Sequence, residues 1–186
     1  MVSISYISRC IKKKNREIII GSNNTGKIKE IRDLLPKKYK IFTPNDFNLR
    51  SPKENGKSFI ENSLIKAEYY SKKTGKICIA DDSGLEIDYL DKAPGIFSAR
   101  WGGQKGNFHI AINKVFRELN KKDKKWKDKK IVARFVCALT IFGFKKKPIH
   151  SLGIIEGTIS KNKKGKNGFG YDPIFIPKEE KKLLVR

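Results

Sequence analysis

Cysteine and histidine are scarce in this chain of 186 residues, which contains three cysteines and two histidines. Cys10, Cys78 and Cys137 lie far apart, and no pair has the C-x-x-C spacing of zinc and redox sites. Cys78 and Cys137 stand inside apolar runs, where a thiol usually packs as a small hydrophobic group. The sequence therefore argues against a zinc site built from these cysteines with His109 or His150.

The chain also lacks a long apolar segment. No apolar run approaches the roughly 18 residues of a membrane span. Near the start, a short apolar patch precedes Lys12-Lys13-Lys14, which is the reverse of the order in a secretory signal. We therefore interpret residues 1–15 as an N-terminal extension and 16–186 as a single domain. We expect a cytoplasmic protein with no membrane partner.

Acidic residues are few, with 19 against 42 basic ones, and the formal net charge is +23. Such a charge favours association with nucleic acids. However, the lysines are scattered or lie in loop-like segments such as 121–130 and 145–147. The sequence has no arginine-rich arm, no zinc-finger spacing and no aromatic strand pattern of an RNA-recognition domain. We expect no specific nucleic-acid partner, only weak, salt-sensitive binding of polyanions. A non-catalytic basic nucleic-acid-binding protein remains an alternative.

Apolar periodicity predicts an α/β fold in which helices flank a mixed central β-sheet. Strands are expected at 16–21, 41–43, 77–80, 85–88, 134–144 and 149–159, the last two as antiparallel neighbours around the turn 145–148. Helices are expected at 28–35, 58–75 and 108–119. Ser58 and Glu61 have the spacing of a capping box, and residues 121–130 are interpreted as a solvated connection.

One short segment, 81–91, contains five of the 19 acidic residues. The strand 77–80 leads into Asp81, Asp82, Ser83 and a turn glycine, Gly84, and no basic residue occurs from 81 to 91. Two adjacent carboxylates repel each other, so a cation often stabilises one of them or its pKa shifts. Because a rigid sheet directs side chains at a strand end into a crevice, the segment is a candidate site. A solvated Asp-Ser-Gly turn is the alternative.

The segment Gly21–Lys27 joins the first strand to the first helix and has the spacing G-x-x-x-x-G-K. Its small residues let backbone N–H groups approach an anion, and the N-terminus of the following helix adds positive potential. Lys27 supplies a point charge for phosphate. A P-loop requires Ser or Thr for magnesium at the next position, which here is Ile28. A polar turn that caps the helix is the alternative.

A glycine-rich segment, 167–173, follows the last long strand. Its glycines surround two aromatic residues, so a flexible loop could present Phe169 for stacking on a nucleobase. Asp172 could accept hydrogen bonds or orient a neighbouring group. A turn with buried aromatic residues is the alternative.

Together and in this order, these segments resemble the inosine/xanthosine triphosphate pyrophosphatase family. The matching stretches are 22–27, 59–62, 80–85, 93–101 and 168–175, and the resemblance covers about residues 17–177. The family hydrolyses ITP, dITP and XTP to the monophosphate and pyrophosphate, which removes these deaminated nucleotides from the nucleotide pool. It uses Mg²⁺, has a mixed α/β fold with a central cleft, and usually forms homodimers. The resemblance implies the same activity, metal ion, fold and homodimer for this chain.

The resemblance also implies site residues, which are carried over by position. The triphosphate would be held by Ser22, Asn23, Asn24, Thr25, Gly26 and Lys27. Asp82 would be metal ligand and proton acceptor, and Ser83 would contact the substrate. Part of the base pocket would be formed by Phe169, Gly170, Tyr171 and Asp172. The family places an acidic metal ligand a few residues before the glycine that is here Gly56, so Glu54 is the second Mg²⁺ candidate.

The chain departs from the family after Pro177. Family members continue to a C-terminal helix with a substrate-binding Lys and a Ser-His-Arg motif, whereas this sequence ends at Arg186 without them. We therefore expect impaired base selectivity and turnover, and a catalytically impaired family remnant is an alternative function. Normal selectivity for ITP would contradict this expectation.

Overall fold

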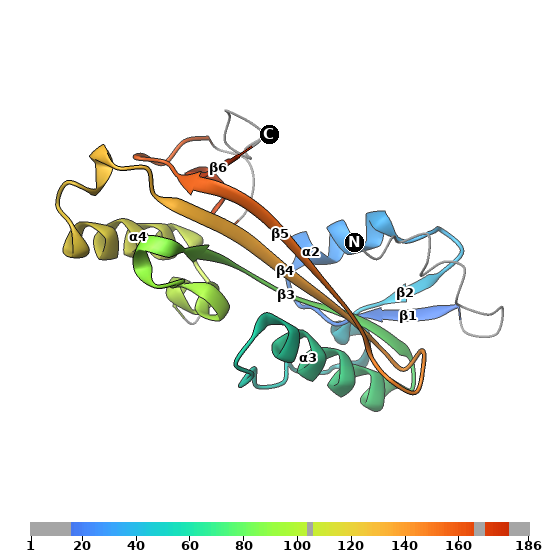
Figure 1. Cartoon of the computed structure of the whole chain (residues 1–186). Coiled ribbons are helices and arrows are strands. Elements are labelled where there is room, and N and C mark those ends of the chain that lie inside the picture. Colours follow the sequence, from blue (N-terminus) through green and yellow to red (C-terminus); the bar gives the residue numbers. More distant parts are fainter. Residues whose placement is uncertain (1–15, 104–105, 166–169, 179–186) are drawn as a thin grey trace. The chain divides into compact units, whose positions relative to one another are not determined.

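The computed structural model describes residues 16–103, 106–165 and 170–178 (Figure 1). The helices are α2 (Thr25–Leu34), α3 (Phe59–Thr74) and α4 (Phe108–Lys122). The strands are β1 (Glu17–Ile20), β2 (Lys40–Phe42), β3 (Ile77–Ile87), β4 (Val132–Phe142), β5 (Ile149–Ile159) and β6 (Phe175–Pro177). The predicted N-terminal extension, 1–15, lies outside the described residues.

Strands in the described residues are hydrogen-bonded in the order β2-β1-β3-β4-β5-β6. β1 pairs in parallel with β2 and β3, and β5 pairs antiparallel with β6. The predicted mixed α/β sheet is therefore confirmed. Internal contacts divide the chain into two compact units, unit 1 (1–82 and 137–153) and unit 2 (83–136 and 154–186). The long strands β3, β4 and β5 contribute residues to both units, and the single domain remains a prediction.

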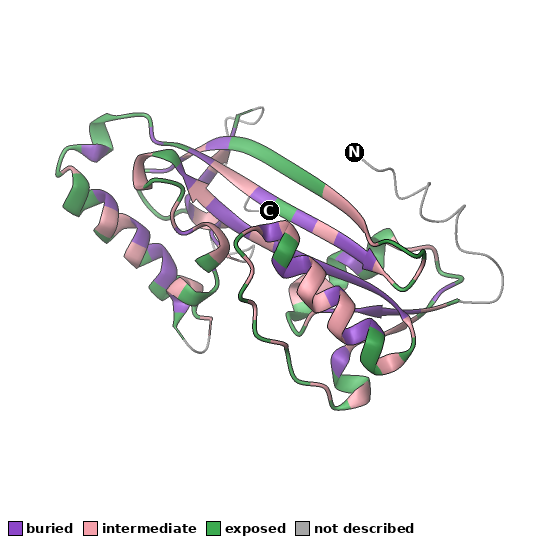
Figure 2. Ribbon diagram, turned by 60° about the horizontal axis from the view of Figure 1, so that its bottom comes forward, coloured by how far each residue is buried: buried purple, intermediate pink, exposed green. Residues whose placement is uncertain are grey.

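In unit 1, β1 and β3 have an apolar cluster on each face. One cluster joins the strands to α2 and contains Ile18, Ile20, Ile31, Ile77 and Ile79. The other joins them to α3 and contains Ile19, Ala67, Tyr70, Cys78 and Ala80. Figure 1 shows α2 and α3 on opposite sides of these strands, and Figure 2 shows the strands buried. Burial on both faces explains why these strands are continuous apolar runs in the sequence.

β3 runs without interruption from Ile77 to Ile87. The prediction of two strands, 77–80 and 85–88, with a turn between them was therefore wrong. The neighbouring strand β4 is equally long at 11 residues. A long partner offers backbone hydrogen bonds to an extended segment, so the polar residues 81–84 need no local turn. Asp81 and Asp82 consequently lie inside a strand, and both are buried.

α3 has the predicted boundaries, because its capping residues are local in sequence. Ser58 is the N-cap and accepts a hydrogen bond from the Glu61 backbone N–H at 3.2 Å. Gly75 ends the helix with a positive φ of 66°, a conformation that favours glycine. Only half of the predicted capping box forms, since the Glu61 carboxylate accepts from the N–H of Lys57 instead of Ser58.

Unit 2 contains one apolar core around α4, which packs Ala111, Ile112, Val115 and Leu119 against strand residues such as Leu85. The prediction that 121–130 is only a solvated connection was wrong. Its lysines are exposed, but Trp126 is buried and stacks on Phe116 with ring centroids 5.6 Å apart.

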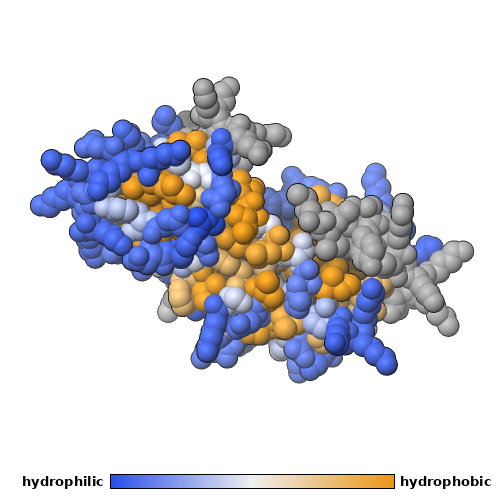
Figure 3. Space-filling model, in the orientation of Figure 1, coloured by the Kyte–Doolittle hydropathy of each residue, from blue (hydrophilic) through white to orange (hydrophobic). Residues whose placement is uncertain are grey.

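The surface combines hydrophilic side chains with apolar areas, as the space-filling view shows (Figure 3). On β5, Ile154 and Ile155 are each about half exposed. None of the helices in the described part of the chain combines the length and the apolarity that a membrane crossing requires.

Close packing around Gly21 gives a testable consequence for stability. A Cβ atom at Gly21 would lie 2.9 Å from both Cys78 Sγ and Tyr70 Cδ2. We expect Gly21→Ala to lower the free energy of unfolding by about 1–3 kcal/mol in urea denaturation. The control is Gly153→Ala, whose Cβ would meet only the Cys137 carbonyl oxygen at 3.8 Å. Equal unfolding midpoints for the two variants would contradict the described packing.

Candidate active site

The loop between β1 and α2 is fixed by its own polar groups. Asn24 is the N-cap of α2, and its Oδ1 accepts from the backbone N–H groups of Gly26 and Lys27 at 2.9 and 3.2 Å. Ser22 Oγ accepts from the Asn24 N–H at 3.2 Å, and Asn23 Nδ2 donates to Ser51 Oγ at 3.0 Å. The first turn of α2 contains no acidic residue. The loop is thus a helix cap, as one alternative held, and no acidic residue within the first turn of α2 offsets the positive end of the helix.

Asp81 and Asp82 point to opposite faces of β3, because successive side chains in a strand alternate. Asp81 Oδ2 lies 2.6 Å from Lys27 Nζ, near the start of α2. Asp82 contacts α3, where its Oδ2 accepts from Asn62 Nδ2 at 3.1 Å and its Oδ1 lies 3.8 Å from Lys66 Nζ. Each carboxylate therefore has its own lysine.

Lys66 joins Asp82 to the loop that precedes α3. Its Nζ lies 2.8 Å from Glu54 Oε1, and its side chain is only 11% exposed. Burial alone would lower the pKa of this ammonium, but the charges of Asp81, Glu54 and Asp82 together raise it. Lys66 therefore remains a cation at neutral pH, with Glu54 and Asp82 beside it.

The pKa of Asp82 is raised to about 6, and burial is the main cause. The negative charge of Glu54 raises it further, while Lys66, the hydrogen bond from Asn62 and Lys27 oppose the shift. At pH 7 such a group is ionised in about ten molecules of eleven. It can accept a proton more readily than an ordinary carboxylate, which suits a general base.

Sequence reasoning gave no role to Asn62 or Lys66. Both lie on α3, four positions apart and hence on one face of the helix. Asn62 belongs to the stretch 59–62 that carried the family resemblance. Its spacing of four residues from Lys66 indicates that the two side chains share one face of the predicted helix. Their contacts with Asp82 depend on the tertiary fold.

Predicted site residues of unit 2 have different environments. Tyr171 is buried in the core, donates its hydroxyl to the Ser98 carbonyl at 2.8 Å and packs edge-on against Phe108. Asp172 and Ser83 are half-buried. Gly170 has a positive φ of 68°, which favours glycine. Phe169 lies outside the described residues. The alternative of a turn with buried aromatics therefore holds for Tyr171.

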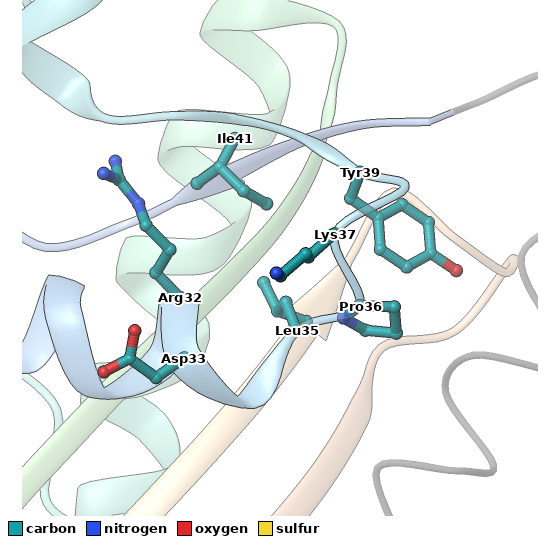
Figure 4. A pocket seen from close by; sticks show the side chains of 7 residues that line it. All are labelled: Arg32, Asp33, Leu35, Pro36, Lys37, Tyr39 and Ile41. Atoms are coloured by element: carbon teal, nitrogen blue, oxygen red, sulfur yellow. The ribbon is translucent and has the colours of Figure 1, made fainter.

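A hollow in unit 1 is lined by residues between the end of α2 and the start of β2 (Figure 4). These residues are distant in sequence from Asp81 and Asp82. The lining consists of Arg32, Asp33, Leu35, Pro36, Lys37, Tyr39 and Ile41. None of these is a predicted site residue. The polar cluster at Asp81 and Asp82 is therefore the better candidate for chemistry.

The described side chains can hold Mg²⁺ only together with ligands from a bound substrate. In the described residues, no three His, Cys, Asp or Glu side chains gather closely enough to hold a metal ion by themselves. Glu54 and Asp82 nevertheless both approach one cation, Lys66 Nζ, at 2.8 and 3.8 Å. Mg²⁺ is commonly held by one or two carboxylates together with substrate phosphates. Two converging carboxylates match that requirement.

Comparison with known proteins shows what the chain as a whole is similar to. Residues 18–185 match the Ham1 family. The dITP/XTP pyrophosphatase of Bacillus licheniformis is 40% identical over 174 residues, which cover 91% of this chain and 86% of that protein. The enzyme of that name from Dictyoglomus thermophilum is 42% identical, over 86% of this chain and 78% of that protein.

Solved structures of Ham1 proteins are also similar to this chain. The Ham1 protein of Staphylococcus aureus has a TM-score of 0.78 and 35% identity, over 91% of this chain and 85% of that chain. A HAM1 protein from Coxiella burnetii has a TM-score of 0.75 and 37% identity, over 86% of this chain and 80% of that chain.

The pair of Lys27 and Asp81 makes a prediction about stability. Lys27→Met leaves the Asp81 carboxylate, 5% exposed, without this ammonium. We expect the free energy of unfolding to fall by about 1–3 kcal/mol, and Lys27→Met/Asp81→Asn to recover most of it. Lys29→Met, at an exposed position of α2, is the control. A double variant no more stable than Lys27→Met would contradict the pairing in chemical denaturation.

The raised pKa of Asp82 predicts a pH-dependent cost in stability. Between the ordinary pKa near 4 and the folded value of about 6, the folded state binds more protons than the unfolded state. The protonated Asp82 carboxyl therefore stabilises the folded state at low pH, and this contribution is lost as the pH rises through 6. We expect Asp82→Asn to be more stable than the parent at pH 7.5, on the order of 1–3 kcal/mol, with the gap closing near pH 4. Thermal unfolding across this range measures it, and a pH-independent gap would refute it.

Proposed function

The chain belongs to the Ham1 family, and on this premise we propose that it hydrolyses ITP, dITP and XTP to the monophosphate and pyrophosphate. The proposal is supported by relatives named dITP/XTP pyrophosphatase. The observation that carries it is the cluster in unit 1, in which Glu54 and Asp82 converge on Lys66 while Lys27 stands at the start of α2.

Asp82 is assigned as the base. Its carboxylate takes a proton from a water molecule as the water oxygen bonds to the α-phosphorus. The bond from the α-phosphorus to the oxygen that bridges to the β-phosphorus breaks, and pyrophosphate leaves with those electrons. Lys27 and the N-terminus of α2 are suited to bind phosphate oxygens. When held by Glu54 and Asp82, Mg²⁺ supplies positive charge against the phosphates.

Base selection requires a pocket that accepts a 6-oxo group and penalises a 6-amino group. One unpaired buried polar group costs about 1–3 kcal/mol, or roughly 5- to 150-fold in discrimination. We propose that Ser83, Phe169, Gly170 and Asp172 contribute to this pocket. Tyr171 is buried, and its hydroxyl already donates to the Ser98 carbonyl. We therefore propose a structural role for Tyr171 behind this pocket.

We also propose a homodimer and a cytoplasmic location, where the nucleotide pool is available. The dimer rests on the family resemblance, and the part of β5 that belongs to unit 2 has two exposed apolar residues, Ile154 and Ile155, on opposite faces of the strand.

The direct test is pyrophosphate release from ITP, dITP, XTP, GTP and ATP, with Mg²⁺ and with a chelator. We expect Mg²⁺-dependent release that favours the first three, and a loss of about 10²–10⁴-fold in kcat for Asp82→Asn. Asp33→Asn makes the same chemical change at an exposed position of α2 and should leave the rate unchanged.

Two results would contradict the proposal. Orthophosphate as the product would indicate attack on the terminal phosphate, as in a P-loop reaction. No release from a protein shown to be folded would mean that the chain is not a pyrophosphatase.

A further inference from the structure

One side chain of α3 connects the two segments that carry the proposed metal ligands. Asn62 is fully buried, its Oδ1 accepts from the Gly56 backbone N–H at 2.9 Å, and its Nδ2 donates to Asp82 Oδ2 at 3.1 Å. An N–H group can only donate and an ionised carboxylate can only accept. Only one orientation of the amide therefore satisfies both bonds, and Asn62 has a defined geometry.

The loop before α3 approaches Asn62 too closely for any residue larger than glycine. A Cβ atom at Gly56 would lie 2.7 Å from both Asn62 Oδ1 and Glu61 Cβ. Two positions earlier, Glu54 reaches Lys66 Nζ. Asn62 and Lys66, one turn apart on α3, thus hold the same two segments through separate contacts.

The two oxygens of Asp82 have different partners. Oδ2 is bonded to Asn62, while Oδ1 faces Lys66, the cation that Glu54 also contacts. Rotation of the carboxylate would break the bond from Asn62. The bond therefore directs Oδ1 toward the cationic side of the cluster.

We propose that Asn62 is a positioning residue, which orients the Asp82 carboxylate for proton transfer and fixes the Glu54 loop beside it. The proposal rests on the function proposed above. Asn62 itself contacts no reacting atom in this account. Its contribution should appear in turnover, because a misdirected base slows the chemical step, and much less in the KM for substrate.

Two substitutions separate the two bonds of Asn62. Asn62→Asp retains an acceptor for the Gly56 N–H but, when ionised, has no donor for the Asp82 carboxylate, whereas Asn62→Leu loses both bonds. The matched control is Ser63→Ala, the next residue on α3. Ser63 is also fully buried and bonded, to Thr140 Oγ1 at 2.6 Å and to the Ile60 carbonyl at 2.9 Å, and neither bond involves Asp82.

We expect both Asn62 variants to lower kcat for ITP about 10- to 100-fold, with KM changed less than about threefold. Ser63→Ala should keep kcat within about threefold of the parent even if it loses as much stability. Amide hydrogen exchange, followed by NMR without substrate, supplies a second readout. Exchange at Gly56 should be faster in Asn62→Leu and close to the parent rate in Asn62→Asp.

Equal losses of kcat in Asn62→Asp and Ser63→Ala would overturn the positioning role, since stability alone would then explain them. Unchanged Gly56 exchange in Asn62→Leu would overturn the link to the loop. An inactive parent protein with faster Gly56 exchange in Asn62→Leu would overturn the proposed function and the role in turnover, while supporting the link between Asn62 and the loop.

Discussion

The alternation of side chains along β3 separates Asp81 from Asp82, and the arrangement of the candidate site depends on this separation. Because β3 is extended here, adjacent carboxylates reach opposite faces of the strand and different helices. Asp81 is paired with Lys27 at the start of α2, and Asp82 contacts Asn62 and Lys66 on α3. Two buried carboxylates can be neighbours in sequence because each has its own ammonium.

The electrostatics of the site come from a few buried groups and not from the net charge of +23. Lys66 is mostly buried and remains charged because the negative charges of Asp81, Glu54 and Asp82 raise its pKa, and Glu54 and Asp82 lie beside it. The pKa of Asp82 stays above the ordinary carboxyl value because the effect of burial outweighs that of its favourable partners. A carboxylate that costs stability while charged is expected where its proton affinity serves a reaction.

Local sequence signals were enough for much of the fold. Ser58 and Gly75 mark the ends of α3 through capping chemistry that depends only on neighbouring residues. The same reasoning ended a strand at residue 80 and interpreted 121–130 as a solvated connection. Both errors arose from tertiary context, because β4 beside β3 and the packing of Trp126 on Phe116 cannot be read from the local sequence. The site residues Asn62 and Lys66 were missed because Asp82 meets them only in the folded chain.

The central claim is that water attacks the α-phosphorus of the nucleotide. Hydrolysis of ITP in water enriched in oxygen-18, followed by phosphorus NMR of the products, tests it most directly. The account predicts that the label enters only the nucleoside monophosphate, because the bond from the α-phosphorus to its bridging oxygen is the one that breaks. Label in pyrophosphate or in orthophosphate would place the attack on another phosphorus and contradict the account.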